Sequence, residues 1–192
     1  MAEDSNSSSS THPPLPPTSE DDRFAWLRLL RSRRVGPATF WRLLSEHGTA
    51  LAALEALPQV AAAAGVENYH VCPEGVALAE VKAARGHGAV LVFRGEPAYP
   101  PLLSDVSDPP PFLWVCGAPE VLARPSVSLV GARNASSLGT RMARALARGL
   151  GAEGYAVISG LARGVDTAAH DAALATGTVA VLAGGVDVLY PS

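Results

Sequence analysis

The sequence predicts an α/β protein in which a small helical domain precedes a parallel sheet. Two observations lead to this prediction. Before residue 88, apolar residues recur at spacings of three and four, as they do along one face of a helix. After residue 126, short and almost wholly apolar runs alternate with amphipathic segments, as expected for strands that are covered on both faces.

Residues 1–22 are polar, rich in serine and proline, and hold five acidic residues without a lysine or arginine. Such a segment buries too little apolar surface to offset its ordering entropy, so it is predicted to be a disordered tail. The chain has 15 basic and 18 acidic residues, a net charge of −3. Without the five tail acids the remainder is net positive, and six arginines lie between Arg124 and Arg163.

Residues 23–87 are predicted to form the helical domain. The apolar positions fall into two sets, each on one helix face: Phe24, Leu27 and Leu30, then Phe40, Leu43 and Leu44. Pro37 suits the first turn of the second helix, where its missing N–H has no partner to lose. Gly48, Pro58 and Gly65 are predicted to divide the rest of this domain into short helices.

Residues 88–192 are predicted to contain five strands, at 89–93, 112–117, 127–130, 155–159 and 179–183. Helices are predicted at 139–150, with Met142, Leu146 and Leu150 on one side, and at 166–174. The last three strands with their two helices form the nucleotide-binding half of a Rossmann-like sheet. Because the chain ends before a second half, the sheet is expected to be truncated, with an open edge.

In such a sheet, ligands bind where the parallel strands end. The first of these loops offers Gly131, Arg133 and a helix N-terminus, groups that suit a phosphate. The second loop consists of Ser159, Gly160, Leu161, Ala162, Arg163 and Gly164, whose glycines permit close backbone approach. A third loop, 184–187, offers only backbone amides. The first loop lacks the GxGxxG pattern and no acidic residue follows the second strand, so NAD binding is not predicted.

Asp166 and His170 lie four residues apart, on one helix face. They suit either a catalytic acid–base pair or, as we prefer, a helix cap and a hydrogen-bonded structural histidine. No nucleophile or metal-ligand spacing is found in the loops, so the sequence predicts a binding protein without catalytic residues, metal or cofactor.

Cys72 and Cys116 are predicted to be free, buried thiols of a reducing cytoplasm. No apolar run approaches the length of a membrane span, and the N-terminus lacks the apolar core of a signal peptide. A cytoplasmic protein without membrane contact is therefore expected.

Three stretches together resemble the DprA/Smf family, the DNA-processing protein A of natural transformation. They are residues 127–139, SGLARGVDTAAHDAAL at 159–174 and VAVLAGGVDVLYP at 179–191. Residues 99–117 extend the resemblance, and RRVGPATFWRLL at 33–44 is similar to the family's SAM-like or helix-hairpin-helix domain. The later Arg-Asn-Arg motif of the family is absent.

The resemblance implies a protein that binds single-stranded DNA, protects it, helps to load the recombinase RecA and acts as a homodimer. It also implies that Arg133 lies in a basic DNA pocket and that the loop 159–164 lines the same pocket.

Two alternatives remain at this stage. One is a nucleotide or phosphoribosyl hydrolase similar to the lysine-decarboxylase-like proteins, although their Pro-Gly-Gly-x-Gly-Thr loop does not occur here. The other is a structural role in which the helical domain is an interaction module.

Overall fold

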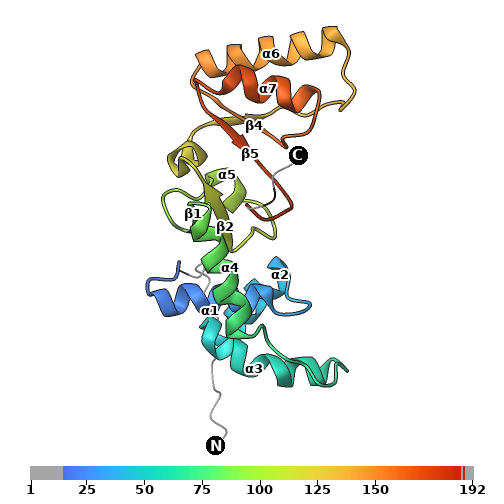
Figure 1. Cartoon of the computed structure of the whole chain (residues 1–192). Coiled ribbons are helices and arrows are strands. Elements are labelled where there is room, and N and C mark those ends of the chain that lie inside the picture. Colours follow the sequence, from blue (N-terminus) through green and yellow to red (C-terminus); the bar gives the residue numbers. More distant parts are fainter. Residues whose placement is uncertain (1–14, 187, 189–192) are drawn as a thin grey trace, which may run out of the picture. The chain divides into compact units, whose positions relative to one another are not determined.

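The computed structural model describes residues 15–186 and residue 188 (Figure 1). These residues form two compact units. The helical unit comprises residues 15–79 together with 93–95 and 106–111. The sheet unit comprises residues 80–92, 96–105, 112–186 and 188. The predicted domains are each continuous in sequence. In the structure, each unit is instead built from several separate segments of the chain.

Helix α1 (Glu20–Arg31) begins inside the segment 1–22 that was predicted to be disordered. The Ser19 hydroxyl accepts a hydrogen bond from the Asp22 amide at 3.0 Å, which satisfies one of the free N–H groups of the first turn. Three acidic residues in that turn also complement the helix dipole. Local capping therefore extends the helix into the polar segment, and residues 1–14 lie outside the described residues.

Helix α2 (Pro37–His47) begins at Pro37, as predicted. Helix α3 (Ala50–Ala63) contains Pro58 in its interior, so the prediction that this proline separates two helices is wrong. Leu54, Leu57 and Ala61, on both sides of the proline, are buried, and this packing holds one helix together across the lost hydrogen bond. A fourth helix, α4 (Glu74–Gly86), follows.

The core of the helical unit is built around aromatic rings. The Trp26 ring meets the rings of Phe40, Trp41 and Phe93 edge to face, with centroids 5.0, 5.6 and 5.8 Å apart. The Trp41 indole N–H donates to the Pro109 carbonyl at 2.7 Å, so this polar group is also satisfied. The segments 93–95 and 106–111 thus supply a ring and an acceptor to the helical unit.

The predicted strands lie in the sheet unit, apart from Phe93, which ends the first strand and belongs to the helical unit. Strands β1 (Ala89–Phe93) and β2 (Phe112–Cys116) form a two-stranded sheet, and the short helices α5 (Pro101–Ser104) and η1 (Pro119–Ala123) were not predicted. A second, parallel sheet has the order β3 (Ser126–Ser128), β4 (Ala156–Ser159) and β5 (Thr178–Ala180). Helices α6 (Ser137–Ala152) and α7 (Val165–Ala173) connect these strands and lie on the same side of β4 and β5 (Figure 1). The predicted α/β class with a parallel sheet is confirmed.

Small side chains form the core between these two helices and the parallel sheet. The buried cluster consists of Ala147, Val157, Ala169 and Ala173. A Cβ atom at Gly151 of α6 would overlap the Thr176 side chain, which shows how closely the backbone packs there. Met142 and Leu146, which were predicted to share one side of α6 with Leu150, are exposed, whereas Leu150 is partly buried against this cluster.

As predicted, Cys72 and Cys116 are not joined in a disulfide. Cys72 is buried, whereas Cys116 is exposed, contrary to the prediction. In the described part of the chain, no helix combines the length and the apolar character that crossing a bilayer requires.

Candidate functional site

The loop that follows β3 and the loop that follows β4 are in close contact. The Val165 amide donates to the Ala132 carbonyl at 3.2 Å. Gly164 has a φ of +88°, and a Cβ atom there would overlap the carbonyl oxygens of Ala132 and Arg133. A Cβ atom at Gly131 would lie 2.6 Å from Cγ2 of Val165. Glycine is required at both positions, because any side chain would force the two loops apart.

Ser159 joins the ends of the two strands. Its side chain is 4% exposed, and its hydroxyl donates to the Leu129 carbonyl at 2.6 Å. The Leu129 amide in turn donates to the Ile158 carbonyl at 2.9 Å, which continues the ladder beyond β3. The predicted pocket hydroxyl is therefore part of the sheet, where it fixes the start of the second loop.

Asp166 and His170 form hydrogen bonds to the backbone of the second loop. The Gly160 amide donates to Oδ2 of Asp166 at 3.2 Å, and the Leu161 amide donates to Nε2 of His170 at 3.3 Å. Leu161 has a φ of +56°, unusual for a residue with a branched side chain. Asp166 does not cap α7, whose N-cap is Gly164 without a side-chain hydrogen bond, because its carboxylate accepts from the loop amide instead.

The hydrogen bonds of His170 define its neutral form. Because Nε2 accepts from the Leu161 amide, the ring proton lies on Nδ1, which faces the Thr178 hydroxyl at 2.8 Å. That hydroxyl donates to the Val157 carbonyl at 2.8 Å and is therefore free to accept from Nδ1. Burial lowers the pKa of His170, and the nearby carboxylates of Asp166 and Asp171 oppose this shift. Asp166 and His170 are thus both engaged with the main chain.

Arg133 and Arg163 are exposed, one on each loop. Neither guanidinium has a hydrogen-bond or ion-pair partner in residues 15–186 and 188. Arg124, by contrast, donates to the carbonyls of Thr176 and Gly154 at 2.7 and 2.9 Å, so its charge serves the fold. The two loops therefore carry two exposed guanidinium groups that make no contact with the described residues, and their backbones lie close together.

Two threonines of this site were not singled out from the sequence. Thr178 holds His170, and the Thr167 hydroxyl donates to the carbonyl of Ala162 at 2.8 Å. The only signal was a polar residue at the start of an apolar strand, in the case of Thr178. Of the third loop, Gly184 and Gly185 are exposed and Asp187 lies outside the described residues. In the described part of the chain, no cluster of histidine, cysteine and carboxylate side chains has the arrangement of a metal site.

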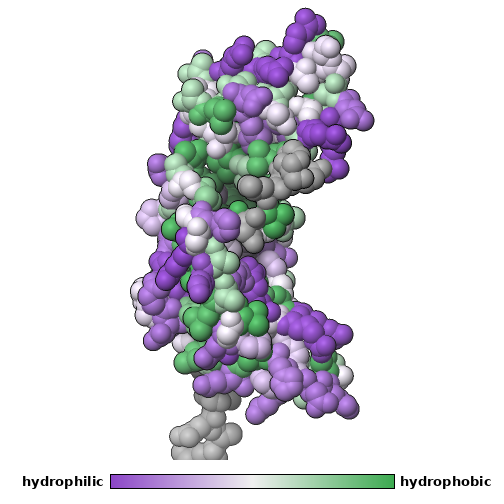
Figure 2. Space-filling view, in the orientation of Figure 1, coloured by the Kyte–Doolittle hydropathy of each residue, from purple (hydrophilic) through white to green (hydrophobic). Residues whose placement is uncertain are grey.

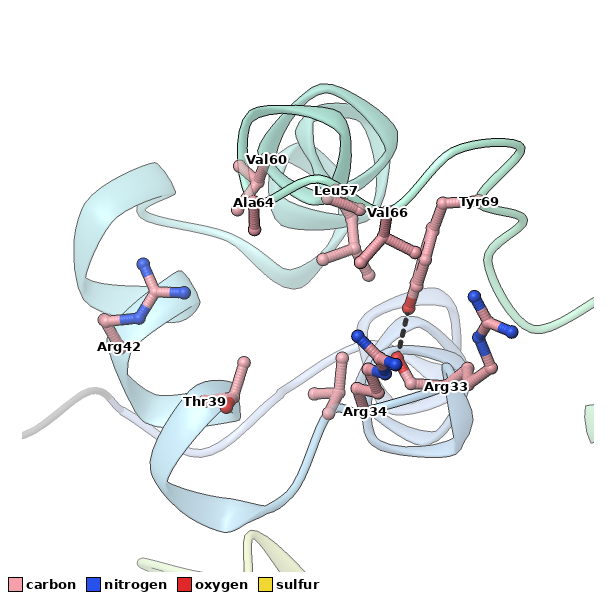
Figure 3. A pocket seen from close by; sticks show the side chains of 11 residues that line it. Arg33, Arg34, Thr39, Arg42, Leu57, Val60, Ala64, Val66 and Tyr69 are labelled. Carbon is pink, nitrogen blue, oxygen red and sulfur yellow. Dashed lines mark hydrogen bonds between the residues drawn. The ribbon is translucent and has the colours of Figure 1, made fainter.

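A hollow of about 160 Å³ lies in the helical unit (Figure 3). Its lining combines three arginines, Thr39 and Tyr69 with the apolar residues Val35, Leu57, Val60, Ala61, Ala64 and Val66. The Tyr69 hydroxyl donates to the Arg33 carbonyl at 2.6 Å, and Arg42 is paired with Glu46, which leaves Arg33 and Arg34 as the remaining charges. No carboxylate, histidine or thiol is among the lining residues, so the hollow offers no group for acid–base or nucleophilic chemistry.

Two family models match the chain. The model described as DNA recombination-mediator protein A matches residues 90–192, and that described as the DprA-like N-terminal HHH domain matches residues 20–83. The second match agrees with the predicted helix-hairpin-helix character of the N-terminal helices.

Curated relatives match about half of the chain. The DNA processing protein DprA of Streptococcus pneumoniae is 43% identical over 95 residues, which are 48% of this chain and 33% of that protein. Protein Smf of Synechocystis is 36% identical over 102 residues, or 50% of this chain and 26% of that protein. Protein Smf of Escherichia coli is 38% identical over 95 residues, or 48% and 25%. The matched stretch thus spans a third or less of the length of each relative.

The X-ray structure of DNA processing protein A from Streptococcus pneumoniae is similar in fold. It aligns with a TM-score of 0.62 and 27% identity, covering 92% of this chain and 62% of that chain. The likeness includes both the helical and the sheet regions.

Proposed function

Since the chain belongs to the DNA recombination-mediator protein A family, we propose that it binds single-stranded DNA and catalyses no reaction. The proposed site is the pair of loops 131–136 and 159–164. The observation that carries the proposal is their apposition, which brings Arg133 and Arg163 to one end of the sheet with no other partner in the described residues. Guanidinium groups and backbone amides bind phosphate oxygens without any chemical step.

Gly131, Gly160 and Gly164 contribute backbone that a strand of DNA can approach closely, and Leu161 and Ala162 lie between them on the second loop. Ser159, Asp166 and His170 take a supporting role in this proposal, because each is buried and hydrogen-bonded to the main chain. Because the side chains of Asp166 and His170 are buried and accept hydrogen bonds from loop amides, they are not available for proton transfer to a ligand. This favours DNA binding over acid–base catalysis.

The test is binding of a fluorescein-labelled oligo-dT to the whole chain, followed by fluorescence anisotropy across a salt series. Arg133→Ala and Arg163→Ala should each weaken binding and reduce the slope of log affinity against log salt by about 0.7, the value for one phosphate contact on a single strand. Lys82→Ala removes one positive charge from an exposed side chain of α4 and is the matched control. Equal affinity of Arg133→Ala and the parent protein would show that the site lies elsewhere.

We extend the proposal to the recombinase RecA, to homodimer formation and to protection of the bound strand, which the family resemblance implies. RecA filament formation on DNA coated with a single-strand-binding protein should accelerate when this chain is added, and Arg133→Ala should abolish the acceleration. Sedimentation velocity measures the oligomeric state directly. Protection of the oligonucleotide from an added nuclease tests the remaining part.

The hydrolase alternative makes an opposite prediction for Asp166. Turnover of nucleotides by the purified chain that disappears in Asp166→Asn would replace the binding proposal with an enzymatic one. Unchanged nucleotides after prolonged incubation are the expected result.

A further inference from the structure

Three arginines of the sheet unit take no part in the proposed site. From the start of β3 to the end of the second loop, residues 126–164 contain five arginines and one acidic residue, Glu153. Arg133 and Arg163 belong to the two loops. The other three lie on helix α6 and are Arg141, Arg144 and Arg148. More than half of the positive charge of this part of the chain therefore lies on α6.

The three arginines form one row along the helix, which we call the arginine row. Their spacings are three and four residues, so at 100° per residue they lie within an arc of about 60° around the helix axis. Ser137, the first residue of α6, lies on the same side, four residues before Arg141. Because a helix rises about 1.5 Å per residue, the row extends from the end of the loop 131–136 to about 16 Å along α6. In Figure 2 hydrophilic side chains lie over α6, at the top of the view.

The arginine row does not stabilise the helix that carries it. Within residues 15–186 and 188, none of the three arginines has a hydrogen-bond or ion-pair partner. The helix contains no aspartate or glutamate, and none of the three lies in its last turn, where a positive charge would complement the helix dipole. Like charges three or four residues apart repel each other and weaken a helix. The row therefore lowers the stability of the fold unless a negatively charged ligand covers it.

Building on the proposed function, we propose that a single strand of DNA bound at the two loops continues along α6, with its phosphates on Arg141, Arg144 and Arg148. The loop 131–136 leads directly into α6, so the row begins beside Arg133 in the chain. A strand of DNA carries one negative charge on each nucleotide and can meet successive arginines with successive phosphates. Such contacts are independent of base sequence, so the row adds affinity and lengthens the bound strand without adding specificity.

An acidic helix of a partner protein fits the arginine row less well. Such a helix binds through apolar side chains as well as through charge. The large exposed apolar residues of α6 lie on the opposite flank, because at 100° per residue Leu138, Met142 and Leu146 are centred about 130° away from the row. The row thus presents charge without an apolar surface, which suits a phosphodiester backbone.

The test is the fluorescence anisotropy of labelled oligo-dT of about 30 nucleotides with the whole chain. Arg141→Gln, Arg144→Gln and Arg148→Gln each remove one charge and keep helix propensity, so the circular dichroism spectrum should not change. Each should weaken binding by about threefold or more and reduce the slope of log affinity against log salt by about 0.7. Lys82→Gln removes one charge from α4 and is the matched control. Arg148→Lys, which keeps the charge, should retain the salt slope of the parent protein.

The length of the strand separates a continuous path from a general effect of charge. With the parent protein, affinity should rise with oligonucleotide length until the strand reaches from the loops to Arg148. Arg148→Gln should weaken the binding of long strands and leave that of the shortest ones unchanged, whereas Arg133→Ala should weaken binding at every length. An equal loss at every length in Arg148→Gln would overturn the path along α6.

The proposal is also overturned if the three row variants bind the long strand as tightly as Lys82→Gln does. If Arg133→Ala weakens binding in that case, the proposed function stands and the strand does not follow α6. If the row variants weaken binding and Arg133→Ala does not, DNA contacts α6 without the loops, and the continuous path is wrong. Weaker binding in Arg133→Ala and in all three row variants supports both proposals.

Discussion

The helical unit and the parallel-sheet part of the sheet unit bury different kinds of side chain. In the helical unit, Trp26 and Phe40 lie in the interior with Phe93, and large rings meet edge to face. Around the parallel sheet, alanines and Val157 fill the interior, while Leu138, Met142 and Leu146 of α6 point outward. The first region depends on a few large side chains. The second depends on close backbone approach and on polar contacts that hold its loops.

The largest effect is expected for Trp26→Ala, because Trp26 is 4% exposed and contacts three aromatic rings. Removing the indole should lower the free energy of unfolding by about 3–5 kcal/mol. Leu146→Ala, on the exposed face of α6, should change it by no more than about 0.5 kcal/mol. Urea denaturation followed by circular dichroism measures both variants. If Trp26→Ala and Leu146→Ala lowered the free energy of unfolding by similar amounts, the two regions would not differ in their dependence on large side chains.

Gly164→Ala tests the dependence of the sheet unit on backbone approach. The positive φ and the overlap of Cβ with two carbonyl oxygens should together lower the free energy of unfolding by about 2–3 kcal/mol. Gly149→Ala is the matched control, since a Cβ atom at Gly149 on α6 meets nothing within 4 Å. That change should stabilise the helix by up to about 1 kcal/mol. A Gly164→Ala protein as stable as its parent would show that the loops can separate without loss.

His170 adds a pH dependence to the same loops. Its folded-state pKa lies below the ordinary value of 6.5, so the unfolded chain takes up the proton more readily. The contribution of neutral His170 is present above about pH 6.5 and is lost as the pH falls toward its folded-state pKa. Protonated Nε2 would also face the Leu161 amide as a second donor.

Urea denaturation at pH 7.5 and pH 5.5 measures the effect. His170→Gln retains an acceptor for the Leu161 amide but does not titrate, so it should show a smaller loss at the lower pH than the parent. An identical loss in both proteins would assign the pH dependence to other groups.

The smallest effect is expected at the surface of the helical unit. Arg42 pairs with Glu46 at 2.8 Å one helical turn away, and both side chains are about half exposed. Glu46→Gln should lower the free energy of unfolding by about 0.3–0.5 kcal/mol, and less at high salt. A double-mutant cycle with Arg42→Gln isolates the pair. A coupling well above 1 kcal/mol would indicate that charge matters more to this unit than its aromatic core suggests.

Periodicity and turn residues predicted the elements well where local and tertiary preferences agree. The strand at 89–93 and the start of α2 at Pro37 were predicted at the positions observed. Pro58 misled the prediction, because its local preference against a helix interior was outweighed by burial on both sides. Periodicity placed Met142 and Leu146 on one side of a helix, but it did not predict that they would be exposed, since it identifies an apolar face and not what that face packs against.

The loops of the candidate site were located from the sequence, because glycines and arginines after apolar strands indicate the carboxyl end of a parallel sheet. The roles of individual residues were less predictable. Asp166 was expected to cap a helix and instead accepts from the Gly160 amide, and Thr178 entered only through its hydrogen bond to His170. Gly160 and Asp166 are 6 residues apart in the sequence, and His170 and Thr178 are 8 apart. Each pair is brought together by the path of the loop between its members, which the sequence pattern does not specify.

By itself, the sequence determined the α/β class, the order of the five strands with α6 and α7 between the last three, and the loops that carry Arg133 and Arg163. These properties follow from hydrophobic periodicity and from the conformational limits of glycine and proline, which act over a few residues. Only the tertiary structure decided that the first two loops touch, that the Ser159 hydroxyl bonds to the main chain of the neighbouring strand, and that α6 turns Leu138 and Leu146 outward. Those outcomes depend on how closely two helices and a sheet can approach, a condition that no local pattern encodes.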